Sequence, residues 1–583
     1  MAFLNIDSWC LPARQRAPRL HCSSVMVAVV LLTSVGLGVV LAAPPKASEK
    51  RRGNPFAILA GYGVGIFGPS ESVPGVRINL VVTSEVFTEH SEHIVNALST
   101  LREPFLVNLF SLDCVDDDMC SRLASIANLV GLRLPKDGLS PEGFTVLAGS
   151  PFVRELSLDD RDVTTFDMTT LSSLKSLNLL ELNGAVLSDA NWGQLKKAES
   201  LESLSCEDVR LTPDAWSAIR SLPRLKSLVV GGRWLTGKDI EELSTISGLE
   251  KVSILNARLS AEDLRPLARL PRCKVLDLSG STAQRYSLDV VADVKGLRTL
   301  QWRDLADLRS DMSVIQRREL TALGRMEHLA EVDFSDTRLD DEGLHGISAL
   351  TALRKSKIER CHAISDAGLS ALAALRHLDE VHVSGDQLTS RGVAAVARLP
   401  NLRVLTAYGV DIAPEDLTAL ARLGRIERLG LSFPKQSQSL QSSERLMAAV
   451  GTIASLRSLT VTGLHHNKET LAPLLNLQVL EELDLYGSQL DENAVRVLGG
   501  LRSLQILRFC CGPNGTDDSV DALRQLPKLQ FVSIAEGGEI TDDCWRLLGD
   551  QVVVRRFPEG RIKLRNISIS GEFEDGEAVR VLP

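Results

Sequence analysis

A six-residue pattern, L-x-x-L-x-L, returns along this chain at a regular spacing and limits the folds that it can adopt. Seventeen units carry it, at steps of 24 or 25 residues except for a step of 32 after Leu297 and one of 30 after Ile426. A unit of this length cannot bury its apolar face alone, so the sequence predicts a stacked repeat array. The first position of the pattern is held by Leu129, Val153, Leu177, Leu201, Leu225, Leu249, Cys273, Leu297, Leu329, Leu353, Leu378, Leu402, Ile426, Leu456, Leu480, Leu504 and Leu529.

Each unit is predicted to contain a strand, a turn and a helix. In "LAEVDFSDTRLDDEGLHGISAL", residues 329–350, Val332 and Phe334 alternate as in a short strand with one buried face. Asp340 follows as an expected helix N-cap, and apolar residues then recur at helical spacing. Other units are expected to begin their helices at the N-caps Ser140, Thr212 and Ser260, two of which precede a proline.

This pattern resembles the leucine-rich repeat, in particular its 24-residue bacterial kind, which is related to the cysteine-containing and ribonuclease-inhibitor-like subtypes. The resemblance covers roughly residues 129–550. It implies an α/β fold: a curved leucine-rich-repeat solenoid with parallel strands on the concave face and helices on the convex face. It also places Cys361 at the ninth position of its unit, where the family's asparagine or cysteine points inward, so we expect a buried and inert thiol.

A 19-residue run without charge, Val25 to Ala43, precedes the repeats. It is long enough to cross a bilayer as one helix, and Pro44 and Pro45 fit signal-peptide cleavage after Ala43 poorly. We therefore expect an uncleaved single-pass membrane anchor, although a cleaved signal peptide stays an alternative. Three basic residues precede the run and four follow it, so the side of the membrane on which the repeats lie is open.

The expected organisation has five parts. Residues 1–24 form an N-terminal tail, 25–43 the transmembrane anchor, 44–104 a linker and N-terminal cap, 105–550 the solenoid and 551–583 a C-terminal cap. The caps are expected because an open array must cover its terminal core, and residues 561–570 are the candidate for the last edge strand. The long steps predict insertions at about residues 303–319 and 433–445, and the polar segment 435–443 is expected to be accessible to proteases.

Charge points to a protein partner. Residues 1–52 carry a net charge of +5, so the rest of the chain carries −14, which argues against nucleic acid because phosphate backbones need a basic face. Acidic residues gather on strand and turn positions expected to face water in the units that begin at Val153, Leu177 and Leu201. The residues predicted to bind a basic segment of a partner are Glu155, Asp159, Asp160, Glu181, Glu207 and Asp208.

No recognised catalytic or cofactor pattern stands out. The glycines 63, 65 and 68 match G-x-G-x-x-G, but prolines follow where a helix should begin, and "TEHSEH" (residues 88–93) offers two histidines without a third ligand. Cys114 and Cys120 could form a disulfide, which their spacing does not decide. We therefore expect no cofactor, no metal and no enzyme activity.

The predicted function is a membrane-tethered repeat scaffold that binds a protein through its concave face and inserted loops. This prediction rests on analogy with the fold. The alternative is a substrate receptor or regulatory subunit of an enzyme, or an enzyme whose site lies in the cap or the insertions.

Overall fold

The computed structural model describes residues 59, 64–67, 78–82, 84–102, 104–109, 115–134, 138–281, 287–303, 322–337, 339–385, 387–410, 412–433, 440–464, 466–511, 515–535, 538–539 and 553–557. All of them lie in the unit Val40–Pro583. The expected anchor at residues 25–43 and the expected edge strand at residues 561–570 lie outside them.

The described strands are short and return once per unit. They are β1 (Gly65–Phe67), β2 (Ile78–Val81), β3 (Phe105–Asn108), β4 (Leu129–Arg133), β5 (Glu155–Ser157), β6 (Leu179–Glu181), β7 (Ser203–Glu207), β8 (Ser227–Gly231), β9 (Lys251–Leu255), β10 (Val275–Asp277), β11 (Thr299–Gln301), β12 (Glu331–Asp333), β13 (Lys355–Ile358), β14 (Glu380–Ser384), β15 (Val404–Tyr408), β16 (Arg428–Ser432), β17 (Ser458–Thr462), β18 (Glu482–Leu490), β19 (Ile506–Cys511), β20 (Gly515–Thr516), β21 (Phe531–Ala535), β22 (Gly538–Glu539) and β23 (Val553–Phe557).

Helices alternate with these strands. The α-helices are α3 (Ser84–Ser99), α4 (Asp117–Ala124), α5 (Pro141–Ala148), α6 (Asp189–Leu195), α7 (Pro213–Arg220), α8 (Gly237–Ser244), α9 (Ala261–Leu264), α10 (Ser287–Val291), α12 (Asp341–Ile347), α13 (Asp366–Leu372), α14 (Ser390–Val396), α15 (Pro414–Leu423), α16 (Leu440–Val450), α17 (Lys468–Leu471), α18 (Glu492–Leu498) and α19 (Asp517–Asp521). Short 3₁₀ helices occupy Met168–Ser173, Arg265–Arg269, Ala472–Asn476 and Ala522–Gln525.

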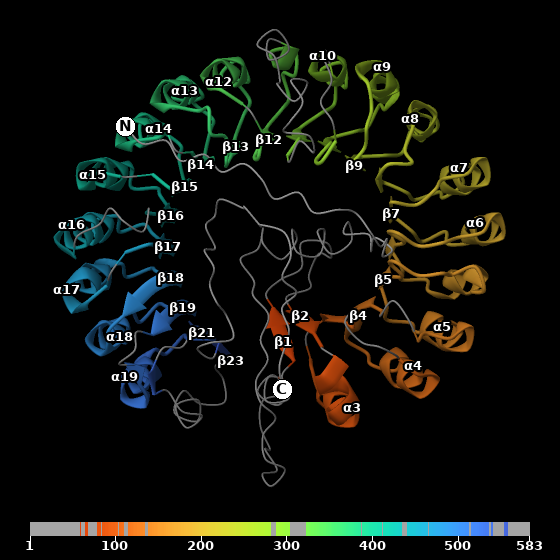
Figure 1. The fold of residues 1–583 in the computed structure, drawn as a ribbon, viewed down its shortest axis with the longest axis horizontal. Coiled ribbons are helices and arrows are strands. Elements are labelled where there is room, and N and C mark those ends of the chain that lie inside the picture. The colour runs from red at the N-terminus through yellow and green to blue at the C-terminus, as the bar shows by residue number, and fades with distance from the viewer. Residues whose placement is uncertain are drawn as a thin grey trace, which may run out of the picture. The chain divides into compact units, whose positions relative to one another are not determined.

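One continuous sheet joins the units. As far as the structure describes it, the sheet has 21 strands; β1 pairs with β2 antiparallel, and every later pair, from β2–β3 to β21–β23, is parallel. Strands that follow one another along the sheet lie side by side, with the helices on the outer side of the curve and the strands on the inner side (Figure 1). The expected arrangement of concave strands and convex helices is therefore confirmed.

The predicted register is also confirmed. Paired residues in neighbouring strands are 24 apart in most units, as for Glu155 and Leu179, and the step of 32 appears between Thr299 and Glu331. All seventeen first-position side chains are buried, with exposed fractions of 6% or less. The fourth and sixth positions add a second apolar row, in which Phe334 is fully buried. The core is thus a stack of aliphatic layers between the sheet and the helices.

Side-chain caps begin the helices where the sequence predicts them. The Ser140 hydroxyl accepts from the Gly143 amide at 2.8 Å, and the hydroxyls of Thr212 and Ser260 each accept from an amide at 3.2 Å. The Asp340 carboxylate caps α12 in the same way. These caps satisfy amides that have no partner inside the helix, so each short helix can start at a fixed point in its unit.

A left-handed turn follows the strand at the eighth position of many units. Gly184 and Gly232 have φ of 64° and 86°, and Asp160 and Asp208 each have φ of 54°. The two residue types alternate along this part of the array for a steric reason: a Cβ built on Gly184 would lie 2.3 Å from Asp160 Oδ1, and one on Gly232 2.0 Å from Asp208 Oδ1. Each aspartate side chain therefore occupies the space that the next unit's glycine leaves open.

Gly65 begins strand β1, so this glycine lies in a sheet and not in a phosphate-binding loop.

The polar segment 435–443 was expected to be an exposed loop, which is wrong for residues 440–443: helix α16 begins at Leu440 and Ser443 is fully buried. The helix forms because Ser443, Leu446, Met447 and Val450 share a buried face, which polar composition hides.

The buried row of the sheet can be tested with Phe334→Asp. The new carboxylate would lie in the aliphatic core, so we expect a loss of more than about 3 kcal/mol of stability. Thermal and urea unfolding followed by circular dichroism measure this loss. Glu331→Gln, three residues earlier in the same unit but exposed, is the control and should change stability by less than about 0.5 kcal/mol. An unchanged midpoint for Phe334→Asp would show that the register is wrong.

Candidate binding surfaces

The inner face of the sheet carries the third, fifth and seventh residues of each unit, because successive strand residues point to opposite sides. In β5, β6 and the residues that follow them, these positions hold Glu155, Asp159 and Glu181. Arg133, the fifth residue of the preceding unit, reaches the same place from β4. The acidic pattern of the three units from Val153 to Leu201 did not predict this arginine, because it belongs to the preceding unit.

Arg133 bridges two of the predicted acidic residues. Its Nη2 atom lies 3.2 Å from Glu181 Oε1 and 3.6 Å from Glu155 Oε1. Attraction to Glu181, opposed by burial, raises the pKa of the Arg133 guanidinium. One cation thus stands among three carboxyl groups, so the cluster formed by Arg133, Glu155, Asp159 and Glu181 has more acidic than basic groups. We call this set the Arg133 cluster.

Asp159 is the member of the Arg133 cluster whose charged form is disfavoured. Burial, together with the nearby Glu181 carboxylate, raises the pKa of Asp159 to about 7. Its Oδ1 atom accepts a 2.7 Å hydrogen bond from the Asn183 amide, which opposes this shift without cancelling it. The charge of the inner face at this point therefore changes near neutral pH.

Two predicted site residues do not face water. Glu155 is 0% exposed and Glu207 5% exposed, so the expectation that all six acidic side chains lie at the surface is wrong for these two. Glu207 Oε1 accepts a hydrogen bond from Asn256 Nδ2 at 2.5 Å across two units, and burial raises the pKa of Glu207. The physical reason is curvature, since neighbouring side chains crowd on the inner side of a curved sheet.

Asp160 and Asp208 occupy the left-handed eighth positions described above, and both are partly exposed. Aspartate, asparagine and glycine are the residues that tolerate this conformation best. Their backbone role accounts for these aspartates without a ligand. Whether any of the six acidic residues binds a partner stays a prediction.

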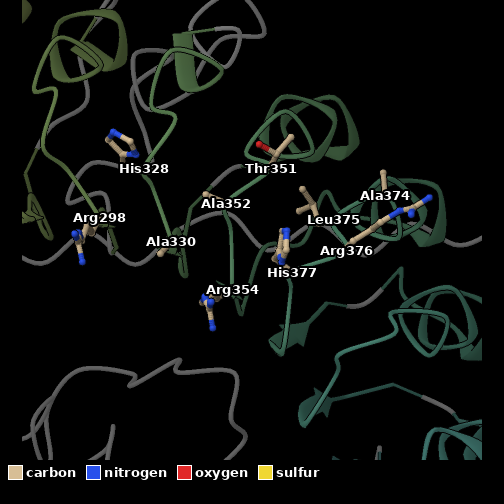
Figure 2. Close-up of a pocket in the computed structure, with 10 residues that line it drawn as sticks. All are labelled: Arg298, His328, Ala330, Thr351, Ala352, Arg354, Ala374, Leu375, Arg376 and His377. Carbon is tan, nitrogen blue, oxygen red and sulfur yellow. The ribbon is translucent and has the colours of Figure 1, made fainter.

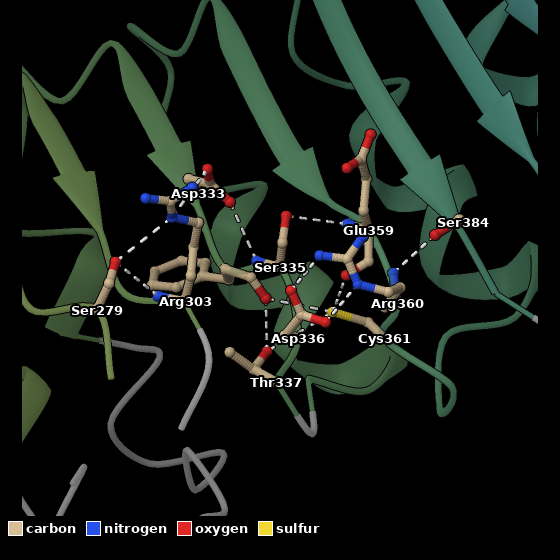
Figure 3. Close-up of polar contacts among 11 residues, drawn as sticks. Ser279, Arg303, Asp333, Ser335, Asp336, Thr337, Glu359, Arg360, Cys361 and Ser384 are labelled. Atoms are coloured by element: carbon tan, nitrogen blue, oxygen red, sulfur yellow. Dashed lines mark hydrogen bonds and ion pairs between the residues drawn. The ribbon is translucent and has the colours of Figure 1, made fainter. Parts of the chain in front are cut away.

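The middle of the inner face holds a second polar network (Figure 3). The Arg360 guanidinium pairs with the Asp336 carboxylate, and the Arg360 amide donates to Ser384 Oγ at 2.7 Å. Arg360 has φ of 55°, unusual for a long side chain, and the bonds to Asp336 and Ser384 stabilise it there. Arg303 lies nearby, 3.7 Å from Asp333. Here acids and bases pair, so the network holds turns together.

The repeat pattern did not predict one exposed aromatic residue. Trp234 follows β8 and is 51% exposed, with the Arg233 guanidinium 4.6 Å from its ring centre. Val186, at the same position two units earlier, is 56% exposed. Tryptophan and arginine are frequent in the central contacts of protein interfaces. Trp234 and Val186 both hold the tenth position of their units. The register places this position in an outward-facing turn, so the sequence could have predicted their exposure.

An open cavity of about 640 Å³ lies at the opposite edge, where the strands begin (Figure 2). Basic side chains line it: Arg298, His328, Arg354, Arg376 and His377. Its remaining lining is small or apolar, including Ala330 and Ala352. Among the described residues, no group of three or more His, Cys, Asp or Glu side chains is placed to hold a metal ion.

No protein-family model matches this sequence, and no curated protein matches it. Among solved structures, the chain is similar to an internalin (InlF) from Listeria monocytogenes, with 17% identity over 73% of this chain and 89% of that chain and a TM-score of 0.31. It is also similar to the TLR13–ssRNA13 complex, with 15% identity over 82% of this chain and 81% of that chain and a TM-score of 0.41.

The repeat geometry decides the fold, because in most units strand, turn and helix return every 24 or 25 residues in one sheet that is parallel from β2 onward, with its helices outside. The protein is a leucine-rich-repeat solenoid. The leucine-rich-repeat array explains Cys361, which is fully buried, with its sulfur 3.3 Å from the Phe334 carbonyl and 3.6 Å from Thr337 Oγ1. The prediction that Cys361 is buried is confirmed, and burial raises the pKa of this thiol to about 11, which disfavours the reactive thiolate.

Other cysteines of the leucine-rich repeats are also core residues. Cys206 and Cys273 are fully buried. Cys120 is a free, buried thiol, whereas Cys114 lies outside the described residues. In the part of the chain that the structure describes, no helix is long and apolar enough to cross a membrane.

The raised pKa of Asp159 predicts a pH-dependent stability. The folded protein holds this proton more tightly than the unfolded chain, whose aspartate titrates near 3.8, so the contribution of Asp159 to stability falls as pH rises from about 4 to about 7. Asp159→Asn removes the charge and should raise the melting temperature at pH 8, with little change at pH 4. The control is Asp162→Asn: hydrogen bonds from Thr164 lower the pKa of that surface carboxyl, so no gain is expected. Equal curves for Asp159→Asn and wild type at pH 8 would contradict the assignment.

Proposed function

We propose that this protein is a membrane-tethered, non-catalytic scaffold whose leucine-rich-repeat array binds another protein through its inner face. The Arg133 cluster carries the proposal, because it places three carboxyl groups around one arginine on that face. Carboxylates held on adjacent strands attract a complementary surface and speed its arrival. The expected partner therefore presents a basic segment.

The exposed Trp234 and its neighbour Arg233 extend this surface along the turn edge, where they supply contact area that the carboxylates lack. Nucleic acid is not part of the proposal, since the chain after residue 52 carries a net charge of −14 and a phosphate backbone needs a basic face.

The inner-face proposal is tested with Glu181→Lys. The Glu181 side chain is partly exposed, so its reversal should reduce partner binding and flatten its salt dependence without unfolding the protein. Crosslinking in cells followed by mass spectrometry identifies the partner, and titration at two salt concentrations measures the effect. Glu199→Lys, exposed and placed after helix α6, is the control. Binding that ignores both Glu181→Lys and salt would eliminate this face. Glu207 is unsuitable because it is buried.

Membrane tethering is the second part of the proposal and is supported by the uncharged run at residues 25–43. We expect the full chain to stay in the membrane pellet after carbonate extraction and a variant without residues 25–43 to be released. Equal partitioning of the two proteins would contradict tethering by this segment. Protease protection in intact cells then reports on which side the repeats lie.

A further inference from the structure

From Glu202 to Glu481 the second residues of successive units form a row, nearly all of them charged, along the edge where the strands begin. In this row, opposite charges from neighbouring units meet: Lys226 Nζ lies 3.0 Å from Glu202, and Lys274 Nζ 2.7 Å from Glu250. The row from Glu202 onward continues through Lys226, Glu250, Lys274, Arg298, Ala330, Arg354, Asp379, Arg403, Glu427, Arg457 and Glu481. Further along, Arg403 pairs with Glu427 and Arg457 with Glu481, each at 2.6 Å. We call it the edge row.

The alternation of the edge row breaks at Lys274, which is followed by a second cation, Arg298. Ala330 then stands between Arg298 and Arg354, where the alternation of the later units would put an acidic residue. Among the described residues, no carboxylate lies within ion-pair distance of Arg298. Arg354 reaches Asp379 only at 3.9 Å, and Asp379 also lies near Arg403. Two arginines thus flank a position that lacks its negative charge.

The cavity shown in Figure 2 lies at this gap. Arg298 and Arg354 stand on either side of Ala330, and the imidazoles of His328 and His377 line the same cavity. All four basic side chains are exposed, so a ligand can reach them from solvent. The small side chain of Ala330 leaves room for the group that other units supply from their own chain.

We propose that this gap binds a carboxylate side chain from an acidic segment of a partner protein. The bound carboxylate takes the place of the missing acidic residue and pairs with Arg298 and Arg354. Elsewhere in the edge row the group between two cations is an Asp or Glu side chain, which sets the spacing for a carboxylate. This surface lies on the strand-start edge, and its partner has the opposite charge to the one expected at the inner face.

The backbone favours a carboxylate over a phosphate. Phosphate sites commonly use free backbone amides. At this edge the amides of Ala330 and Glu331 both donate to the Arg298 carbonyl, and those of Arg354 and Lys355 both donate to the Ala330 carbonyl. Side chains alone are therefore left to bind the ligand, and the planar guanidinium matches a carboxylate well.

The test uses the full chain in detergent and a fluorescein-labelled hexaglutamate peptide, with binding followed by fluorescence anisotropy at low salt. Ala330→Glu supplies the missing carboxylate from the chain itself and should block the site. The double variant Arg298→Gln/Arg354→Gln removes the two cations. For both we expect an affinity about tenfold lower than that of the wild type, as for the loss of two exposed ion pairs.

Lys226→Gln is the matched control, since it removes a cation of the same row whose carboxylate is present. Its affinity should stay within about twofold of wild type, and melting curves should show that all variants fold. Absent peptide binding, or binding equally strong in Ala330→Glu, would overturn the proposal. Binding of inorganic phosphate in place of the peptide would also overturn it, because the site would then belong to phosphate ligands.

Discussion

In most units each strand residue pairs with the residue 24 or 25 positions further along the chain, and the rest of the structure depends on this pairing. Parallel strands fix the height of every residue relative to its neighbours, so each position of the unit becomes a row that runs along the array. The first position becomes the core row, the second the edge row of charges and the eighth the row of left-handed turns. The surroundings of a side chain in this protein therefore depend on its position in the unit more than on its neighbours in the sequence.

In the eighth row, the turn conformation determines which residue types occur. Asp160, Gly184, Asp208 and Gly232 alternate because each aspartate side chain fills the space above the next unit's glycine. The array thus has a longer period of two units in this region. The Asn256 to Glu207 hydrogen bond, which skips one unit, agrees with it. Asp160 and Asp208, which in the sequence suggest a ligand site, are therefore explained in part by the left-handed turn.

The sequence predicted the fold because leucine spacing reports directly on burial, and the caps at Ser140, Thr212 and Ser260 on helix starts. It did not predict the burial of Glu155 and Glu207, since a linear pattern contains no curvature. Nor did it connect Arg133 with Glu181, because that contact crosses two units and joins residues 48 apart. Local periodicity specifies which face a residue takes, whereas its neighbours on that face follow from the stacking of coils.

A regular array also makes its exceptions informative. Between Glu202 and Glu481 the second position is charged in every unit but one, with Asp379 where other units have Glu. The exception, Ala330, leaves the cations of two neighbouring coils facing an open cavity. On the inner face the imbalance is reversed, with carboxylates in excess around Arg133. Since stacking fixes both places in one sheet, a partner that offers a basic segment to the inner face and an acidic one to the edge would match both. The spacing of those two segments in the partner would then be set by the coils between β5 and β12.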